Sequence, residues 1–290
     1  MSKNSPRISI GMPVYNGERF LQEAIDSILA QTFEDFELII SDNASTDRTE
    51  EICRAYATQD QRIHYYRQQQ NRGAAWNFNH IVGLARGKYF KWASYDDVCA
   101  PTFLARCVEV LDKDPTIVVC HSKTIFTKAN GEKWWTGRSL ANLDSWEPHV
   151  RFQAIISDFW CLEVFGLMRK DVLKTTSLIA PYYGSDRLLL LELSLRGRLK
   201  EIPEALFFRR CHRDQSSRLS QQERKTWIDT KGTGPLQFFK NRGSLRYLCA
   251  IFQAQLNRHE RNRCLSTLMH YIFYSGTWKK FFVKKTPSKA

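Results

Sequence analysis

Strand-like and helix-like segments alternate between residues 8 and 123, and this alternation limits the possible folds more than any other feature of the chain. Short apolar runs typical of buried strands occupy residues 8–12, 36–41, 63–66, 89–93 and 117–122. Between the first two runs, Leu21, Ile25 and Ile28 recur at helical spacing, and similar patterns separate the later runs. This order predicts parallel strands joined by crossover helices, and therefore a Rossmann-like α/β fold with an open, mostly parallel twisted sheet flanked by helices.

Three loops that follow these strands carry polar residues, at positions 13–17, 42–47 and 94–97. In open α/β sheets, ligands bind beyond the carboxyl ends of the strands, so we expect these loops to converge on one crevice. Asp96 and Asp97, after the fourth strand, would repel each other unless a cation lay between them. A divalent metal that bridges a ligand's pyrophosphate would supply this charge. A solvated acidic turn is the alternative for an Asp-Asp pair taken alone.

The first two loops, together with residues 71–73, offer groups that could hold a nucleotide. Pro13 fixes the backbone, Tyr15 has a flat face on which a base could stack, and Asn16 permits a tight reversal. Asp42 could accept a hydrogen bond from a base or a ribose, and Arg72 could pair with a phosphate. An ordinary strand-to-helix turn and a solvated arginine are the structural alternatives.

The pattern changes after residue 123. We predict a hairpin around Asn130-Gly131, helices at 147–159 and 187–196, strands at 164–168, 199–202 and 205–210, and polar helices from residue 221. The predicted organisation is a domain of residues 1–220, made of a nucleotide-binding half (1–123) and an acceptor-binding half (124–220), followed by a basic helical extension, 221–290.

Positive charge is concentrated in that extension. Residues 221–290 contain 14 Lys and Arg against 3 Asp and Glu, whereas residues 1–220 contain 29 against 27. The last segment, 271–290, mixes lysines with large aromatic side chains, which suits peripheral contact with an anionic membrane. A solvated terminus is the alternative. No recognition motif for nucleic acid accompanies the charge, so no specific nucleic acid is expected.

Two other classes of protein are disfavoured by the sequence. No apolar stretch reaches the roughly 18 to 20 residues that span a bilayer, and residues 1–7 are polar, so we expect a cytoplasmic protein, with the inner face of the membrane as the place of any contact. The eight cysteines form no Cys-x-x-Cys pair, which argues against a zinc site or a disulfide framework.

The order of motifs resembles the family 2 glycosyltransferases of the GT-A fold. The matching segments are Ile8-Ser9-Ile10-Gly11-Met12-Pro13-Val14-Tyr15-Asn16, residues 31–45 from Gln31-Thr32-Phe33 to Ser41-Asp42-Asn43-Ala44-Ser45, Asn71-Arg72-Gly73 and Asp96-Asp97. The resemblance covers residues 8 to about 125 and continues more weakly to about 215.

This resemblance implies a nucleotide-sugar donor, with UDP as the expected nucleotide. It implies that Pro13, Tyr15, Asn16, Asp42, Arg72 and Asp96 belong to the nucleotide-sugar site. Asp97 would be the direct ligand of Mn²⁺ or Mg²⁺. Many members have a further Asp two residues before Asp96, where this chain has Ser94, and this departure bears on the number of carboxylate ligands.

Residues of the second half supply the remaining candidates. The resemblance implies that Asp186, ahead of the Leu-rich helix, is the catalytic base, although Ser185 replaces a frequent Glu; a helix cap alone is the alternative. His212 could approach the diphosphate or complete the metal shell, or could be a surface residue. Trp134, Trp135 and Trp160 are assigned to core packing first, with a sugar-stacking acceptor wall as the alternative.

The sequence therefore predicts an inverting, metal-assisted glycosyltransferase that moves a sugar to a hydroxyl of a glycan or a lipid-linked acceptor. Inversion follows from the resemblance alone. A nucleotidyltransferase of related α/β fold is a rival, but it should carry a glycine-rich, lysine-bearing phosphate loop after the first strand, which residues 13–16 lack. A noncatalytic membrane-binding or nucleic-acid-binding protein would explain the tail and leave the loops without a role.

Overall fold

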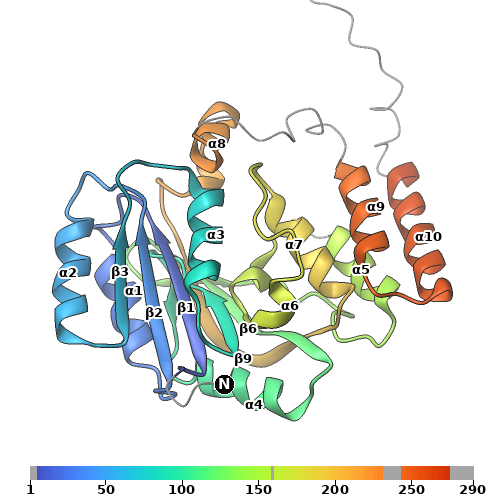
Figure 1. The fold of residues 1–290 in the computed structure, drawn as a ribbon, viewed down its shortest axis with the longest axis horizontal. Helices are drawn as coiled ribbons and strands as arrows, with labels where there is room; N and C mark the ends of the chain where they lie inside the picture. The colour runs from blue at the N-terminus through green and yellow to red at the C-terminus, as the bar shows by residue number, and fades with distance from the viewer. Residues whose placement is uncertain (1–4, 158–159, 231–242, 275–290) are drawn as a thin grey trace, which may run out of the picture.

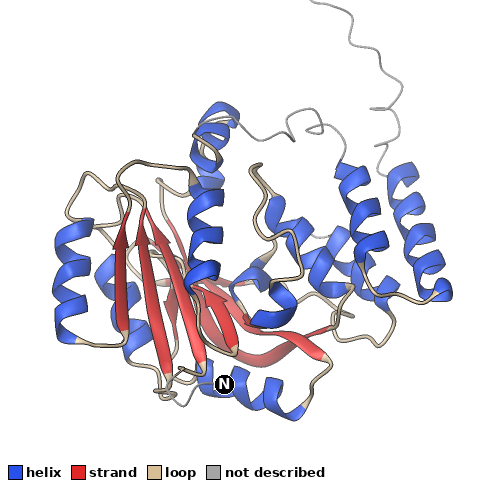
Figure 2. Ribbon diagram, viewed as in Figure 1, coloured by secondary structure: helices blue, strands red, loops and turns tan. Residues whose placement is uncertain are grey.

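The computed structural model describes residues 5–157, 160–230 and 243–274, which form a curved sheet between layers of helices (Figures 1 and 2). The strands are β1 (Ile8–Val14), β2 (Phe36–Asp42), β3 (Ile63–Arg67), β4 (Tyr89–Trp92), β5 (Val98–Cys99), β6 (Ile117–Lys128), β7 (Lys133–Thr136), β8 (Leu167–Arg169) and β9 (Arg198–Cys211). The α-helices are α1 (Leu21–Leu29), α2 (Thr49–Gln59), α3 (Ala74–Leu84), α4 (Phe103–Lys113), α5 (Pro148–Ile156), α6 (Lys170–Leu173), α7 (Ser185–Ser194), α8 (Gln221–Ile228), α9 (Gly243–Gln253) and α10 (Arg258–Tyr274).

Residues 1–123 have the predicted parallel arrangement. Strands β3, β2, β1 and β4 are neighbours in that order and are all parallel. Every residue of β1 and β2 is buried, because helices cover both faces of the sheet. Apolar residues of α1, α2 and α4 fill the core on one face, and those of α3, α5, α7, α9 and α10 fill it on the other.

The second half of the sheet is mixed. Strand β8 lies antiparallel between β4 and β6, β9 runs parallel to β6, and the short β5 is antiparallel to β9. The predicted hairpin is present as β6 and β7. The predicted strand at 164–168 begins later, at Leu167, because residues 162–165 form a 3-10 turn.

The prediction of two short strands around Pro203 is wrong, since β9 is continuous. Its ladder with β6 passes from Ser122 opposite Ile202 to Lys123 opposite Ala205, so Pro203 and Glu204 bulge out of the pairing. Both are exposed. A bulge accommodates a proline because its nitrogen has no hydrogen to donate to the ladder.

The C-terminal helices share the main core. α10 packs on α5 and on α9, and α9 packs on α7. Ile251 and Cys264 are fully buried in the same apolar cluster as Leu189. Of the predicted membrane-contact segment, residues 275–290 lie outside the described residues, and 271–274 end α10. Within the described part of the chain, no helix combines the length and the apolar character needed to cross a bilayer.

Candidate functional site

The loops after β1 and β2 meet, as the sequence predicts. The strands are in register up to Val14 and Asp42, so their loops leave the sheet side by side. The Asn16 backbone N–H donates to the Ser45 hydroxyl at 2.9 Å, and its side-chain oxygen accepts from the Thr46 N–H at 2.9 Å. Asn16 adopts the left-handed conformation (φ +52°), which asparagine tolerates better than most residues.

Tyr15 and Asp42, two residues predicted to bind the nucleotide sugar, differ in solvent exposure. Tyr15, in the first loop, is 40% exposed, and its stacking on a base stays a prediction. Asp42 is completely buried: its carboxylate accepts from the Ser45 N–H at 2.8 Å and from the Tyr65 hydroxyl at 2.7 Å. Asp42 thus fixes the turn that follows β2, and its contact with a base or a ribose stays a prediction.

Asn43 connects these loops to the start of α3. Its amide donates to the Asn71 side-chain oxygen at 2.9 Å and accepts from the Arg72 N–H at 3.0 Å. The Arg72 guanidinium is exposed and lies 3.9 Å above the ring of Trp76. The sequence analysis did not single out Asn43, although an asparagine directly after a strand is the signal that could have found it.

Asp96, Asp97 and His212 lie together at the same edge of the sheet. Asp96 Oδ2 is 2.8 Å from His212 Nε2, and its other oxygen accepts from the Ser94 hydroxyl. Asp97 Oδ1 accepts from the Arg210 N–H at 2.8 Å. His212 is only 4% exposed, so its interpretation as a surface residue is wrong, as is that of the Asp pair as a solvated turn.

The electrostatics of this pair favour a cation. Burial and the neighbouring charge of Asp96 raise the pKa of Asp97, and the positive charges of Arg209 and Lys91 oppose the rise. Lys91 in β4 is 1% exposed, and its ammonium donates to the Trp92 carbonyl at 3.1 Å. A raised pKa means that the surroundings stabilise the charged form of the carboxylate less well than water does, and a bound cation would supply the missing positive charge.

The donor set fits a hard divalent cation as part of a shell. Asp97 Oδ2 accepts no hydrogen bond from any residue that the structure describes, so it is available to a metal ion. Mn²⁺ and Mg²⁺ prefer such oxygens and commonly take the rest of their ligands from phosphates and water. Among the described residues, no group of three or more His, Cys, Asp and Glu side chains could hold a metal without such help.

Asp186 is the second residue of α7, and Gly184 (φ +87°) occupies the position before the helix. Gly184 is the N-cap residue, but the Asp186 carboxylate accepts a hydrogen bond from the Arg187 backbone N–H at 2.9 Å and so satisfies a donor of the first turn. The role of Asp186 as the base stays a prediction. Burial raises the pKa of Asp186, and the positive charges of Arg187 and Arg209 oppose the rise. Asp97 and Asp186 therefore lie within the field of the same guanidinium, that of Arg209.

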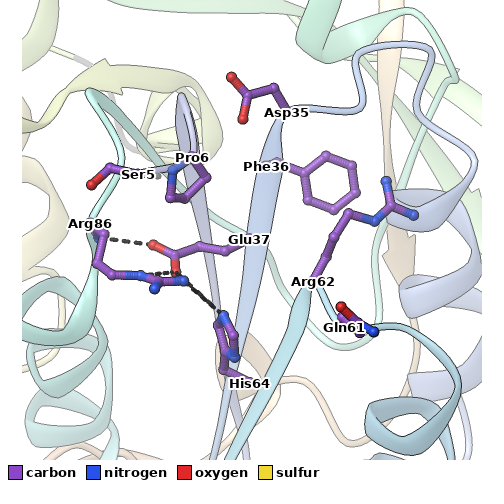
Figure 3. Close-up of a pocket in the computed structure, with 9 residues that line it drawn as sticks. All are labelled: Ser5, Pro6, Asp35, Phe36, Glu37, Gln61, Arg62, His64 and Arg86. Carbon is purple, nitrogen blue, oxygen red and sulfur yellow. Dashed lines mark hydrogen bonds and ion pairs between the residues drawn. The ribbon is translucent and has the colours of Figure 1, made fainter. Parts of the chain in front are cut away.

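A depression of about 410 Å³ lies at the opposite, amino-terminal end of the parallel strands (Figure 3). Glu37 in its wall accepts from the Arg86 guanidinium at 2.7 Å and from the Ser9 hydroxyl at 2.6 Å. Arg86 in turn contacts His64. These side chains hydrogen-bond to one another and connect neighbouring strands at the amino-terminal end of the sheet. None of the predicted site residues lines this depression.

Comparison with known proteins decides the family. The model of glycosyl transferase family 2 matches residues 9–176, which is more than half of the chain. The chain belongs to glycosyltransferase family 2. The matched region begins in β1 and contains the loops after β1, β2 and β4, but it ends before Asp186 and His212.

The sequence relative below matches less than half of the chain, whereas the solved structures match nearly all of it. An uncharacterized glycosyltransferase of Rickettsia typhi is 36% identical over 129 residues, which are 43% of this chain and 39% of that protein. The S. aureus TarS 1–349 structure in complex with UDP-GlcNAc has a TM-score of 0.68 at 19% identity, covering 96% of this chain and 76% of that one. The Pyrobaculum calidifontis mannosyltransferase PcManGT, in complex with GDP-Man and Mn²⁺, has a TM-score of 0.56 at 16% identity, covering 96% and 83%. The fold is of the GT-A type, as predicted.

Proposed function

We propose that this glycosyltransferase moves a sugar from a UDP-sugar to a hydroxyl group of an acceptor, with inversion at the anomeric carbon. The observation that carries the proposal is the pair Asp96-Asp97, buried beside His212 at the carboxyl edge of a family 2 domain. Ligands bind at this edge in open α/β sheets. TarS and PcManGT, which share the fold, were solved with nucleotide sugars.

In this proposal the donor lies across the loops after β1, β2 and β4. Tyr15 stacks on the base, Asp42 and Asp96 accept hydrogen bonds from the base or the sugars, and Arg72 pairs with the diphosphate. Pro13 and Asn16 hold the first loop in shape, as the link from Asn16 to the second loop indicates.

Asp97 Oδ2 would hold the divalent cation, Mn²⁺ or Mg²⁺, and His212, 2.8 Å from Asp96, would be the second protein ligand. Such an ion would supply positive charge to the leaving diphosphate. Ser94 donates to Asp96, where many members have a third carboxylate. We therefore expect the ion to depend on the nucleotide's oxygens for much of its binding.

Asp186 would act as the base. It takes the proton of the acceptor hydroxyl while that oxygen bonds to the anomeric carbon and the bond from this carbon to the diphosphate breaks. Attack from the side opposite the leaving group inverts the configuration. The raised pKa of Asp186, caused by burial, suits this role because a base with a pKa closer to the working pH accepts a proton more readily.

For the acceptor we propose only a chemical class and a place of contact. We expect a glycan or a lipid-linked acceptor, met at the inner face of the membrane through the basic extension, residues 221–290. Its end, 271–290, would contact anionic lipids, where each nearby Lys or Arg contributes about 1 kcal/mol of binding free energy.

A donor panel tests the proposal. UDP-sugars and GDP-sugars are incubated with the protein and Mn²⁺, and nucleotide release and the anomer of the freed sugar are followed. We expect slow hydrolysis of a UDP-sugar that yields the inverted anomer and is lost in Asp97→Ala. Hydrolysis of no donor would contradict the proposal, and a retained configuration would contradict inversion.

A further inference from the structure

An aromatic cluster stands on the face of the sheet that carries Arg209. Trp135 in β7 pairs with Phe126 in β6, and Phe126 pairs with Arg209 in β9. Residues paired on adjacent strands point to the same face, so the three side chains form one row. The Trp135 ring stacks on the Phe126 ring at 4.0 Å with an angle of 5° between their planes.

Trp160 adds a second surface to this cluster. Its ring centre lies 5.4 Å from that of Phe126 and 5.5 Å from that of Trp135, so it stands beside the stacked pair and not on top of it. The planes are inclined by 72° and 68°. Two tryptophan surfaces therefore meet at a steep angle over a phenylalanine.

Two of the three rings in this cluster are exposed to solvent. Phe126 is 2% exposed, whereas Trp135 is 36% and Trp160 is 52% exposed, so the assignment of these tryptophans to core packing is wrong. Leaving large aromatic rings in water forgoes the free energy of burying them. Ring surfaces that stay in contact with solvent beside a candidate site are typical of ligand contacts.

The same row leads to the candidate catalytic residues. The antiparallel pairing of β5 and β9 places Val98 opposite Phe208, the neighbour of Arg209, and the charge of Arg209 acts on Asp97, the residue before Val98. The Arg209 guanidinium lies 5.8 Å from the centre of the Phe126 ring. Its charge also reaches Asp186. Arg209 is thus a neighbour of the aromatic cluster, and its charge acts on both carboxylates.

We propose that Trp135 and Trp160 form the acceptor subsite and that the group bound there is a pyranose ring. This inference rests on the proposed function and narrows its acceptor to a carbohydrate. A pyranose has one flat, weakly polar face of C–H bonds that matches a tryptophan ring, and hydroxyls at its rim that need polar partners. A steep corner between two indole rings, with Arg209 beside the Phe126 ring that both tryptophans contact, offers both kinds of contact.

The test uses free glycosides as acceptors. The donor is the one that the protein hydrolyses, and the probes are the methyl α- and β-pyranosides of glucose, galactose, mannose and N-acetylglucosamine. Nucleotide release is measured against glycoside concentration for the unmodified protein, Trp135→Ala, Trp160→Ala and Trp135→Phe. Trp134→Ala is the matched control, because Trp134 lies in the same hairpin, is 57% exposed, and makes no ring contact with the described residues.

We expect at least one glycoside to raise nucleotide release above hydrolysis. Trp135→Ala and Trp160→Ala should raise the acceptor KM by about tenfold, the loss of about 1.4 kcal/mol of binding, with kcat and donor hydrolysis unchanged. Trp135→Phe should restore part of the affinity, and Trp134→Ala should behave like the unmodified protein. Hydrolysis that no glycoside accelerates, or an equal loss in Trp134→Ala, would overturn the subsite alone. Hydrolysis of no donor would overturn the proposed function and the subsite with it.

Discussion

Substitution of Gly73 tests how the backbone of residues 71–73 is fixed before α3. It precedes α3 with φ +84° and ψ 158°, a backbone region that is essentially restricted to glycine. A Cβ atom there would lie 2.7 Å from the carbonyl oxygen of Ile228 and 2.9 Å from the Cα of Asp229, at the end of α8. Both are backbone atoms, so neither can move aside as a flexible side chain would.

The cost of Gly73→Ala follows from these two effects. Backbone strain contributes about 1–3 kcal/mol and the steric overlap about 1–3 kcal/mol, so the free energy of unfolding should fall by about 2–5 kcal/mol. Gly83→Ala is the matched control within the same helix. Gly83 is exposed, a Cβ atom there meets nothing within 4 Å, and the change should raise the free energy of unfolding by about 0.5–1 kcal/mol.

Urea denaturation followed by circular dichroism measures both variants, and thermal unfolding should place the midpoint of Gly73→Ala at least about 4 °C below that of the unmodified protein. The strain could also be relieved by separation of α8 from α3, which would expose α8 to limited proteolysis. A Gly73→Ala variant that is as stable and as protease-resistant as the unmodified protein would refute the reasoning.

Two further predictions concern carboxylates. Asp186→Asn should lower kcat about 10²–10⁴-fold with the donor KM unchanged, and kcat of the unmodified enzyme should fall as the pH decreases through the raised pKa of Asp186, because the base must be unprotonated; a variant with normal kcat would exclude Asp186 as the base. Burial would raise the pKa of Glu37, but hydrogen bonds from Ser9 and Arg86 outweigh it and lower the pKa below 4.5. The stability that Glu37 contributes is present above pH 4.5 and is lost as the pH falls through the lowered pKa. Glu37→Gln should therefore lower the free energy of unfolding by about 1–3 kcal/mol near pH 7 and remove part of the stability loss that the unmodified protein shows below about pH 4.5. An unchanged acid profile in Glu37→Gln would contradict this assignment.

The parallel half of the fold is predictable because its sequence pattern is local. A hydrophobic pattern within a few residues is enough to predict a buried strand or an amphipathic helix. The carboxyl ends of parallel strands then lie at one edge of the sheet. For this reason the sequence predicts that Asp42 and the Asp96-Asp97 pair lie at the same edge of the sheet. Asp97 was also the more available of the pair, since both oxygens of Asp96 are engaged.

The second half depends on pairings between distant segments, which no local pattern encodes. Pro203 predicted a break in β9, but pairing with β6 carries the strand past it as a bulge. Arg209 and Lys91 are not among the predicted site residues, because only the folded sheet brings their charges to Asp97. The tryptophans could not be divided by sequence, because Trp135 joins the cluster through its register with Phe126 while the neighbouring Trp134 is left out of the pairing.

Calorimetric titration of UDP, with and without Mn²⁺, tests the central claim most directly. We expect UDP binding to require Mn²⁺, to strengthen as the pH rises because Asp97 must lose its proton, and to weaken at least about tenfold in Asp97→Ala. Asp35→Ala is the control, since this exposed carboxylate lies at the opposite end of the sheet (Figure 3), and it should bind UDP normally. UDP binding that is indifferent to Mn²⁺ and to Asp97→Ala would contradict the account.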